Sequence, residues 1–190
     1  MVFAIWLCGA YLVGSLSFAL LCSKWLSLPD PREQGSHNPG ATNVLRTGGK
    51  KAAMLTLIGD MLKGALVVFA AKWSGVAINQ LGWIGFATVL GHAFPVYHRF
   101  KGGKGVATTI GILLAATPVI GAVAVVLWVV IVKATRYSSL AALVSIGLSP
   151  VQSWFLVPEI APAYMLLALV VFHRHRENIT RLQTGTENKV

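Results

Sequence analysis

The sequence predicts an all-helical protein that crosses a membrane several times. Of its 190 residues, 55% are hydrophobic and only 12% are charged, whereas about a quarter of a soluble domain is charged. The apolar residues form long runs that are separated by short polar or proline-containing breaks. The chain has 16 Lys and Arg against 6 Asp and Glu, and positive loops are a rule of membrane topology. Because the apolar runs are too long for a soluble basic domain, we expect no nucleic-acid partner.

The apolar runs justify the individual helices, because a full crossing needs roughly 20 helical residues. The first run is followed by positive charge, beginning with Lys24, which predicts that the N-terminus lies outside and that no signal peptide is cleaved.

In a single helix Cys8 and Cys22 would lie roughly 21 Å apart, too far for a disulfide. Neither belongs to a Cys/His cluster, so no metal site is expected. There are six runs: 3–23, 52–71, 77–97, 105–132, 138–155 and 156–173.

The run 105–132 decides the number of crossings, because Thr117-Pro118 interrupts it and proline disrupts a helix. If the run is two short helices, 105–116 and 118–132, the chain has about seven helices and its C-terminus lies in the cytoplasm. Fourteen of the sixteen basic residues then face the cytoplasm, as the positive-inside rule favours. A single proline-kinked helix is the alternative, since such kinks are common in membrane helices.

Three polar segments, 35–46, 91–108 and 175–189, share the cytoplasmic side in this topology. The first two contain several glycines, which allow backbone N–H groups to approach an anion closely. Lys and Arg accompany them, so the three segments together predict a phosphate site. The second segment is not a Walker motif, because that motif needs Gly at His98 and Ser or Thr at Gly105. By itself its Gly-Lys run is also typical of a solvated turn.

The motifs GSHNPGATNVLR, GHAFPVYHRFKGGKGVAT and HRENITRLQTGTENK resemble the three cytoplasmic motifs of the acyl-phosphate-dependent glycerol-3-phosphate acyltransferases, the PlsY family. The resemblance covers essentially the whole chain, 1–190, as one integral-membrane domain. It departs from the family pattern at His37, where we expect Gly, so we assign His37 no role.

The resemblance implies transfer of a fatty acyl group from acyl phosphate to the 1-hydroxyl of glycerol 3-phosphate, which gives lysophosphatidic acid and phosphate. This is the first acylation of phospholipid biosynthesis in a bacterial inner membrane. No cofactor is expected, and membrane lipid and a soluble acyl-phosphate synthase are expected partners. Acyl-CoA and acyl carrier protein are not expected as donors. The HxxxxD pair of other glycerolipid acyltransferases is absent, because no His is followed by Asp five residues later.

We expect direct attack by the hydroxyl, because an acyl phosphate already carries a good leaving group. Residues that bind the phosphate or glycerol 3-phosphate are predicted to be Arg46, Lys104, Asn38, Thr42, Asn43, Gly103 and Ser139. The predicted catalytic residues are His175, Asn178 and Ser36. His175 and Asn178 share one face if the tail is helical. His175 is either the base or only an orienting group, since a donor phosphate oxygen is an alternative proton acceptor.

For several residues the sequence allows both a structural and a functional role. Ser139 opens the run 138–155, where an N-cap is as good an explanation as substrate contact. His92 is either functional or an interfacial structural histidine, and Asp60 with Lys63 forms either a functional or a structural pair inside the membrane. A small transporter of a phosphorylated metabolite is the alternative function, because a proline-broken hairpin and basic loops also suit a translocation path. A membrane anchor explains the basic loops but not their glycines and asparagines.

Overall fold

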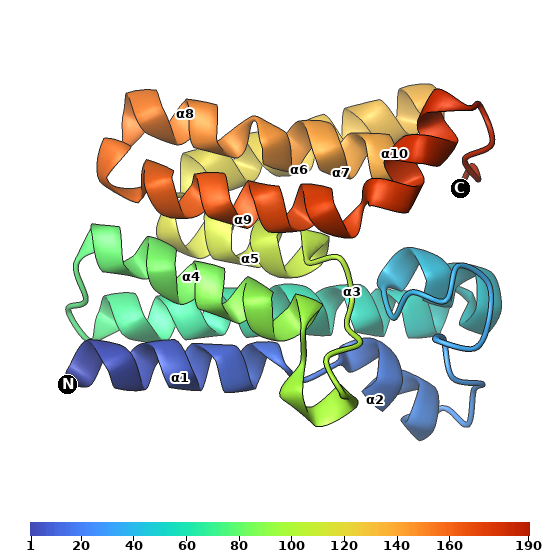
Figure 1. The fold of residues 1–190 in the computed structure, drawn as a ribbon, viewed down its shortest axis with the longest axis horizontal. Helices are drawn as coiled ribbons and strands as arrows, with labels where there is room; N and C mark the ends of the chain where they lie inside the picture. Colours follow the sequence, from blue (N-terminus) through green and yellow to red (C-terminus); the bar gives the residue numbers. More distant parts are fainter.

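A computed structural model describes all 190 residues, and all of its regular elements are helices. Figure 1 shows most of them lying side by side along one axis, with α2, α10 and the longer loops at one end. The helices are α1 (Val2–Gly14), α2 (Phe18–Trp25), α3 (Ala41–Trp73), α4 (Ile78–Ala93), α5 (Val106–Ala116), α6 (Pro118–Thr135), α7 (Ser138–Gly147), α8 (Ser149–Leu156), α9 (Ala161–Arg174) and α10 (Arg176–Gln183), with 3-10 turns η1 (Val96–His98) and η2 (Pro158–Ile160).

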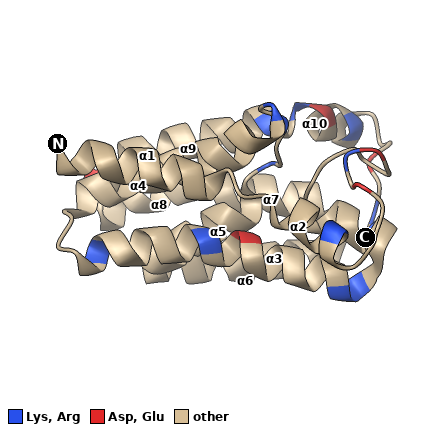
Figure 2. Ribbon diagram, turned by 90° about the horizontal axis from the view of Figure 1, so that it is seen from below, with Lys and Arg blue, Asp and Glu red and all other residues tan.

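Lys and Arg gather at the end of the bundle where α10 lies, as Figure 2 shows. We call this the polar end, and it comprises the segments 26–40, 94–105 (with η1), 136–137 and 175–190 (with α10). Four segments are long and apolar enough to cross a membrane: Val2–Trp25, Ala41–Trp73, Pro118–Thr135 and Ser138–Leu156. α5 has only 11 residues, but most of them are buried, because it lies in the middle of the bundle.

The run 105–132 forms two helices, in agreement with the two-helix interpretation. α5 ends at Ala116 and α6 begins at Pro118, which occupies the first turn where proline needs no hydrogen bond. The two helices fold back on each other, and a Cβ on Gly121 would lie 2.5 Å from the Leu114 nitrogen. α6 continues to Thr135, three residues beyond the expected end at 132.

The first apolar run is not one helix, contrary to the interpretation of 3–23 as a single span. α1 ends at Gly14 and α2 begins at Phe18. Tertiary contacts explain the break. The Ser15 hydroxyl accepts a hydrogen bond from the Val96 N–H at 3.4 Å, and the Leu16 carbonyl accepts one from Lys63 at 2.5 Å.

Several other boundaries differ from the sequence prediction: α4 ends at Ala93 rather than at 97, and α9 begins at Ala161 rather than at 156. α3 begins at Ala41 rather than near 52, so the second half of the first polar segment is helical, and the helix bends at Gly49, whose φ of 81° favours glycine. The run 138–155 is divided between α7 and α8 at Leu148, just before Pro150, which cannot continue the hydrogen bonding of α7.

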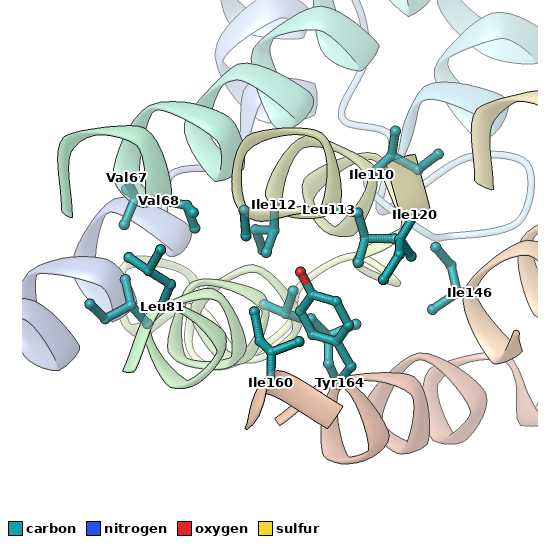
Figure 3. Packing of buried hydrophobic residues seen from close by; sticks show 14 of the residues in the cluster. Val67, Val68, Leu81, Ile110, Ile112, Leu113, Ile120, Ile146, Ile160 and Tyr164 are labelled. Atoms are coloured by element: carbon teal, nitrogen blue, oxygen red, sulfur yellow. The ribbon is translucent and has the colours of Figure 1, made fainter. Parts of the chain in front are cut away.

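Small residues bring the helices close together. A Cβ on Gly111 of α5 would lie 2.0 Å from the Met61 carbonyl oxygen of α3, and one on Gly91 of α4 would lie 2.1 Å from the Tyr11 oxygen of α1. Between these contacts the core is apolar. Figure 3 shows it, with buried side chains from α3, α4, α5, α6, α7 and α9 converging around Tyr164. The bundle is therefore rigidly packed below the polar end.

Candidate active site

The polar end contains a small cavity of about 190 Å³ with no hydrophobic side chain in its lining. Its walls come from three parts of the chain that are far apart in the sequence, as the three motifs predict. Four of the lining residues are Lys or Arg and only one is acidic, so the cavity attracts anions. The lining residues are Ser36, His37, Asn38, Gly102, Lys104, His173, Arg174, Arg176, Glu177 and Arg181.

A wider cavity of about 780 Å³ adjoins the first and shares Gly102, His37 and Arg174 with it. This second cavity is also cationic, because Arg32, Arg99 and Lys101 line it. Among the residues that the structure describes, no group of three or more His, Cys, Asp or Glu side chains is placed to hold a metal ion. Lys and Arg side chains line both cavities.

Lys104 and Asn178 belong to a hydrogen-bond network that is centred on Glu187. Lys104 Nζ donates to Asn178 Oδ1, and Asn178 Nδ2 donates to Glu187 Oε1 at 2.6 Å. Ser139 Oγ donates to the same oxygen at 2.7 Å, and Arg181 Nε donates to Glu187 Oε2 at 2.7 Å. Burial disfavours the charge on Glu187, but these donors outweigh it and lower the pKa of the carboxyl. This network brings together three predicted site residues: Lys104 from the loop 94–105, Ser139 from α7 and Asn178 from α10.

The Lys104 amine lies in a partly desolvated and electropositive place. Burial, and then the positive charge of Arg181, lower the pKa of Lys104 to about 8. The amine therefore stays mostly protonated at neutral pH. An anion that enters the cavity stabilises this charge, because it replaces the lost hydration. Lys104 is thus suited to hold a phosphate group.

His175 is buried between α9 and α10, with 3% of its surface exposed. Its Nδ1 lies 2.8 Å from the Val171 carbonyl oxygen, an arrangement that places a proton on Nδ1 and leaves Nε2 as the free acceptor. Burial, and then the charge of Lys104, lower the pKa of His175 to about 4. The imidazole is therefore neutral and weakly basic.

The structure assigns Asn43 a different task from the predicted contact with phosphate. Its Oδ1 accepts from the Ser36 N–H at 2.9 Å, and its Nδ2 donates to the carbonyls of Pro31 at 2.7 Å and Gln34 at 3.0 Å. Both amide hydrogens are thus occupied, because Asn43 lies on α3 and faces the loop rather than the cavity. Asn43 holds the loop that carries Ser36.

Two other residues of the first motif lie on α3 outside the cavity lining. Thr42 Oγ1 is 3.2 Å from Ser138 Oγ and links α3 to α7. Arg46 is exposed, and its guanidinium donates to the main-chain carbonyls of Asn188 at 3.1 Å and Lys189 at 3.4 Å. Its predicted role as a phosphate clamp stays a prediction, and in this structure Arg46 fastens the C-terminal tail.

Gly103 lies behind the cavity rather than in its lining. Its N–H donates to the His92 carbonyl at 3.1 Å, and a Cβ at this position would lie 2.2 Å from His92 Nε2. Arg174 donates to the carbonyls of Gly102 at 2.7 Å and Gly103 at 3.1 Å. Only glycine fits here, so Gly103 allows the loop to pass between His92 and Arg174.

The sequence prediction missed several residues of this site, among them Arg174, Arg181 and Glu187, and it assigned no role to His37, which lines both cavities. The two arginines were counted only as topology charges, although their repetition along the tail is the pattern of a helix with a basic face. Glu187 lies within the third motif, but its contact with Ser139 of α7 depends on the fold. His37 has φ of 56°, a conformation that favours glycine and that agrees with our expectation of Gly at this position.

An apolar helical bundle with a cationic cavity at one end is the architecture of a membrane protein with a site suited to an anion. A profile described as "Glycerol-3-phosphate acyltransferase" matches residues 4–185. The glycerol-3-phosphate acyltransferase of Methylobacillus flagellatus is 48% identical over 186 residues, which cover 97% of this chain and 95% of that protein. The corresponding protein of Cupriavidus pinatubonensis is 50% identical over 188 residues, which cover 96% of this chain and 93% of that protein.

Solved structures give the same family relationship. PlsY (YgiH), an integral membrane glycerol 3-phosphate acyltransferase, is similar in its glycerol 3-phosphate form with a TM-score of 0.94 at 36% identity, covering 100% of this chain and 96% of that chain. Its lysophosphatidic acid form gives a TM-score of 0.91 at 35% identity, covering 100% and 95%. The chain belongs to the glycerol-3-phosphate acyltransferase family and is a multi-pass membrane protein.

Proposed function

We propose that this protein transfers a fatty acyl group from acyl phosphate to the 1-hydroxyl of glycerol 3-phosphate. The observation that carries the proposal is the cationic cavity, in which Lys104 and three arginines meet at the end of an apolar bundle. Relatives that match over nearly their whole length are named for acylation of glycerol 3-phosphate. Both substrates bear a phosphate, and the two adjoining cationic cavities give room for two anions.

In this reaction the hydroxyl oxygen of glycerol 3-phosphate attacks the carbonyl carbon of the donor. The new ester bond forms, the bond from that carbon to the phosphate oxygen breaks, and the hydroxyl proton leaves. Lys104 and the arginines neutralise phosphate charge, and Ser36 and Asn38 donate hydrogen bonds to it. Since the phosphate is already a good leaving group, holding the two substrates in line supplies most of the rate, and no acyl-enzyme is required.

The leaving phosphate is the better proton acceptor. The pKa of His175 is lowered to about 4, whereas a phosphate group has its second pKa near 6. We therefore assign His175 the orienting role: its Nε2 accepts a hydrogen bond from the attacking hydroxyl while Nδ1 stays bound to Val171. Asn178 fixes the Lys104 amine beside it.

A transporter explains the structure less well. Lys63 is the one basic residue in the apolar part of α3, and Asp60 and His92 already surround it. The other charges lie in loops or at helix ends, so no polar path runs through the bundle. The cavity instead meets the membrane boundary, where a fatty acyl chain and a water-soluble phosphate come together.

We also propose that the polar end faces the cytoplasm of a bacterial inner membrane, with about seven crossings and the N-terminus outside. Fourteen of the sixteen basic residues lie on one side in this arrangement. A soluble acyl-phosphate synthase would then deliver the donor on the same side. In a background without Cys8 and Cys22, a cysteine at exposed Thr186 should resist an impermeant thiol reagent in intact cells, and one at exposed Ser74 should react. Labelling at 186 from outside would contradict the topology.

The activity test uses purified protein with acyl phosphate and labelled glycerol 3-phosphate. Lysophosphatidic acid and phosphate should form in equal amounts, and replacement of the donor by acyl-CoA should abolish the product. Comparable turnover with acyl-CoA would contradict the proposed donor. Uptake of labelled glycerol 3-phosphate into sealed vesicles without any product would favour transport instead.

A further inference from the structure

Asp60, Lys63 and His92 form a buried charged cluster beneath the candidate active site. Their exposed fractions are 3%, 4% and 8%. Lys63 Nζ lies 2.9 Å from Asp60 Oδ1, 2.5 Å from the Leu16 carbonyl oxygen and 2.9 Å from His92 Nδ1. An ammonium has three hydrogens and no lone pair. Lys63 hydrogen-bonds to the Leu16 carbonyl oxygen and to His92 Nδ1, and it forms an ion pair with Asp60 Oδ1, which has no hydrogen-bond partner.

The contact with Lys63 defines the tautomer of His92. Because Nδ1 accepts a hydrogen bond from the Lys63 ammonium, the proton of a neutral imidazole must be on Nε2. The Nε2 edge lies against Gly103, where a Cβ would be only 2.2 Å from that nitrogen. The His92 carbonyl also accepts the Gly103 N–H at 3.1 Å. The cluster therefore contacts the loop at the residue just before Lys104.

The same loop is also held by Arg174, which donates to the carbonyls of Gly102 and Gly103. The backbone before Lys104 is thus hydrogen-bonded to both His92 and Arg174. On stability alone the charged cluster is hard to explain, because a buried ion pair is often no better than well-packed apolar residues. Its contact with the Gly102–Gly103 backbone indicates a role in positioning that loop.

We propose that Asp60, Lys63 and His92 are positioning residues that set the place of Lys104 in the phosphate cavity. Asp60 balances the charge of Lys63, Lys63 fixes the tautomer and ring orientation of His92, and His92 supports the Gly102–Gly103 backbone. None of the three lines the cavity, so they act through Lys104. The kinetic part of this inference rests on the proposed function.

The test removes both charges together in Asp60→Asn/Lys63→Met, so that no unpaired charge stays buried. The variant should unfold at nearly the parental temperature, while kcat/KM for glycerol 3-phosphate falls about tenfold to a hundredfold, since a small misplacement of a binding group costs that much. In a Lys104→Ala background the same change should have little further effect, because contacting groups are coupled. If Asp60→Asn/Lys63→Met lowered kcat/KM by the same factor with and without Lys104→Ala, the proposal would be overturned. It would also be overturned if Asp60→Asn/Lys63→Met kept the parental kcat/KM.

The matched control is Tyr164→Phe, which removes a buried hydrogen bond to Thr117 at the other end of the bundle. It should lower stability without changing kcat/KM. If the double charge variant does not accumulate, His92→Gln removes the imidazole alone and is compared in the same way.

A second readout does not need activity. An amine reagent, with labelling measured at each lysine by mass spectrometry, should modify Lys104 at a rate that changes several-fold in Asp60→Asn/Lys63→Met, while exposed Lys72 stays unchanged. An unchanged Lys104 rate would overturn the positioning role. If the parent makes no lysophosphatidic acid, the proposed function fails, and the labelling result still decides the role of the cluster.

Discussion

The two ends of the bundle use polar groups in different ways. At the end away from α10, the hydroxyls of Thr117 and Tyr164 are 2.9 Å apart and satisfy each other inside the core, and Lys72 is exposed. At the polar end, Lys104 is held by Asn178 but still lines a cavity with three arginines. Closed polar pairs stabilise a fold, whereas charges that are held in place and left open to a cavity are available to a ligand.

The largest effect that separates the two ends is expected for Lys104→Ala. Loss of a charge-assisted contact in a partly desolvated site should cost about 2–4 kcal/mol of transition-state stabilisation, or roughly a hundredfold or more in turnover. The variant should still insert and purify normally, because this side chain carries no core packing. Steady-state kinetics with acyl phosphate and glycerol 3-phosphate measures the loss.

Lys72→Ala is the matched control for that variant and should behave like the parent. Lys104→Arg should recover only part of the activity, because a planar guanidinium replaces a compact ammonium. Near-parental turnover in Lys104→Ala would contradict the claim that Lys104 at the polar end binds phosphate while Lys72 at the other end does not.

A smaller effect is expected for Asn43→Ala, which removes the three hydrogen bonds that hold the loop 31–36. Turnover should fall about tenfold as Ser36 loses its place, with a lower unfolding temperature as well, because the loop's polar groups lose their partners. Asn43→Asp keeps the acceptor for the Ser36 N–H and should retain more activity. If Asn43→Asp were as damaged as the alanine variant, the Ser36 contact would not be the important one.

The pH dependence sharpens the role of Lys104. Its pKa is lowered to about 8 in the empty site, so the charged form that binds phosphate is lost as the pH rises through that value. We expect kcat/KM to be flat below pH 8 and to fall about tenfold for each unit above it. A pH profile of Lys104→Arg should lack this fall, because arginine stays charged. A parental profile that stays flat to pH 10 would contradict the assignment.

The smallest effect is expected at the other end. Thr117→Val should cost about 1 kcal/mol of stability, visible as a modest drop in unfolding temperature, with unchanged kinetic constants. A clear loss of activity in this variant would show that the two ends are coupled.

Sequence patterns predicted the helical membrane fold, the division of 105–132 and the meeting of Ser36, Asn38 and Lys104 at one cavity. These follow from apolar run length, the proline and the charge distribution, which are local or additive properties. The break after Gly14 could not be predicted in this way, because its cause is contact with Val96 and with Lys63.

Side-chain direction was the other property that the sequence could not supply. Asn43 and Arg46 were both expected at the phosphate, but α3 already begins at Ala41 and directs Asn43 toward the loop and Arg46 toward the C-terminal tail. Glu187 was missed although it lies in the third motif, because its place between α10 and Ser139 of α7 depends on how the tail folds back.

The most direct test of the central claim is equilibrium binding of labelled glycerol 3-phosphate to purified protein without donor. The parent and Lys72→Ala should bind it with equal affinity, and Lys104→Ala should bind it at least about tenfold more weakly, because one charge-assisted contact to the phosphate is lost. Equal binding by all three proteins would contradict the claim that the cavity at the polar end is the phosphate site.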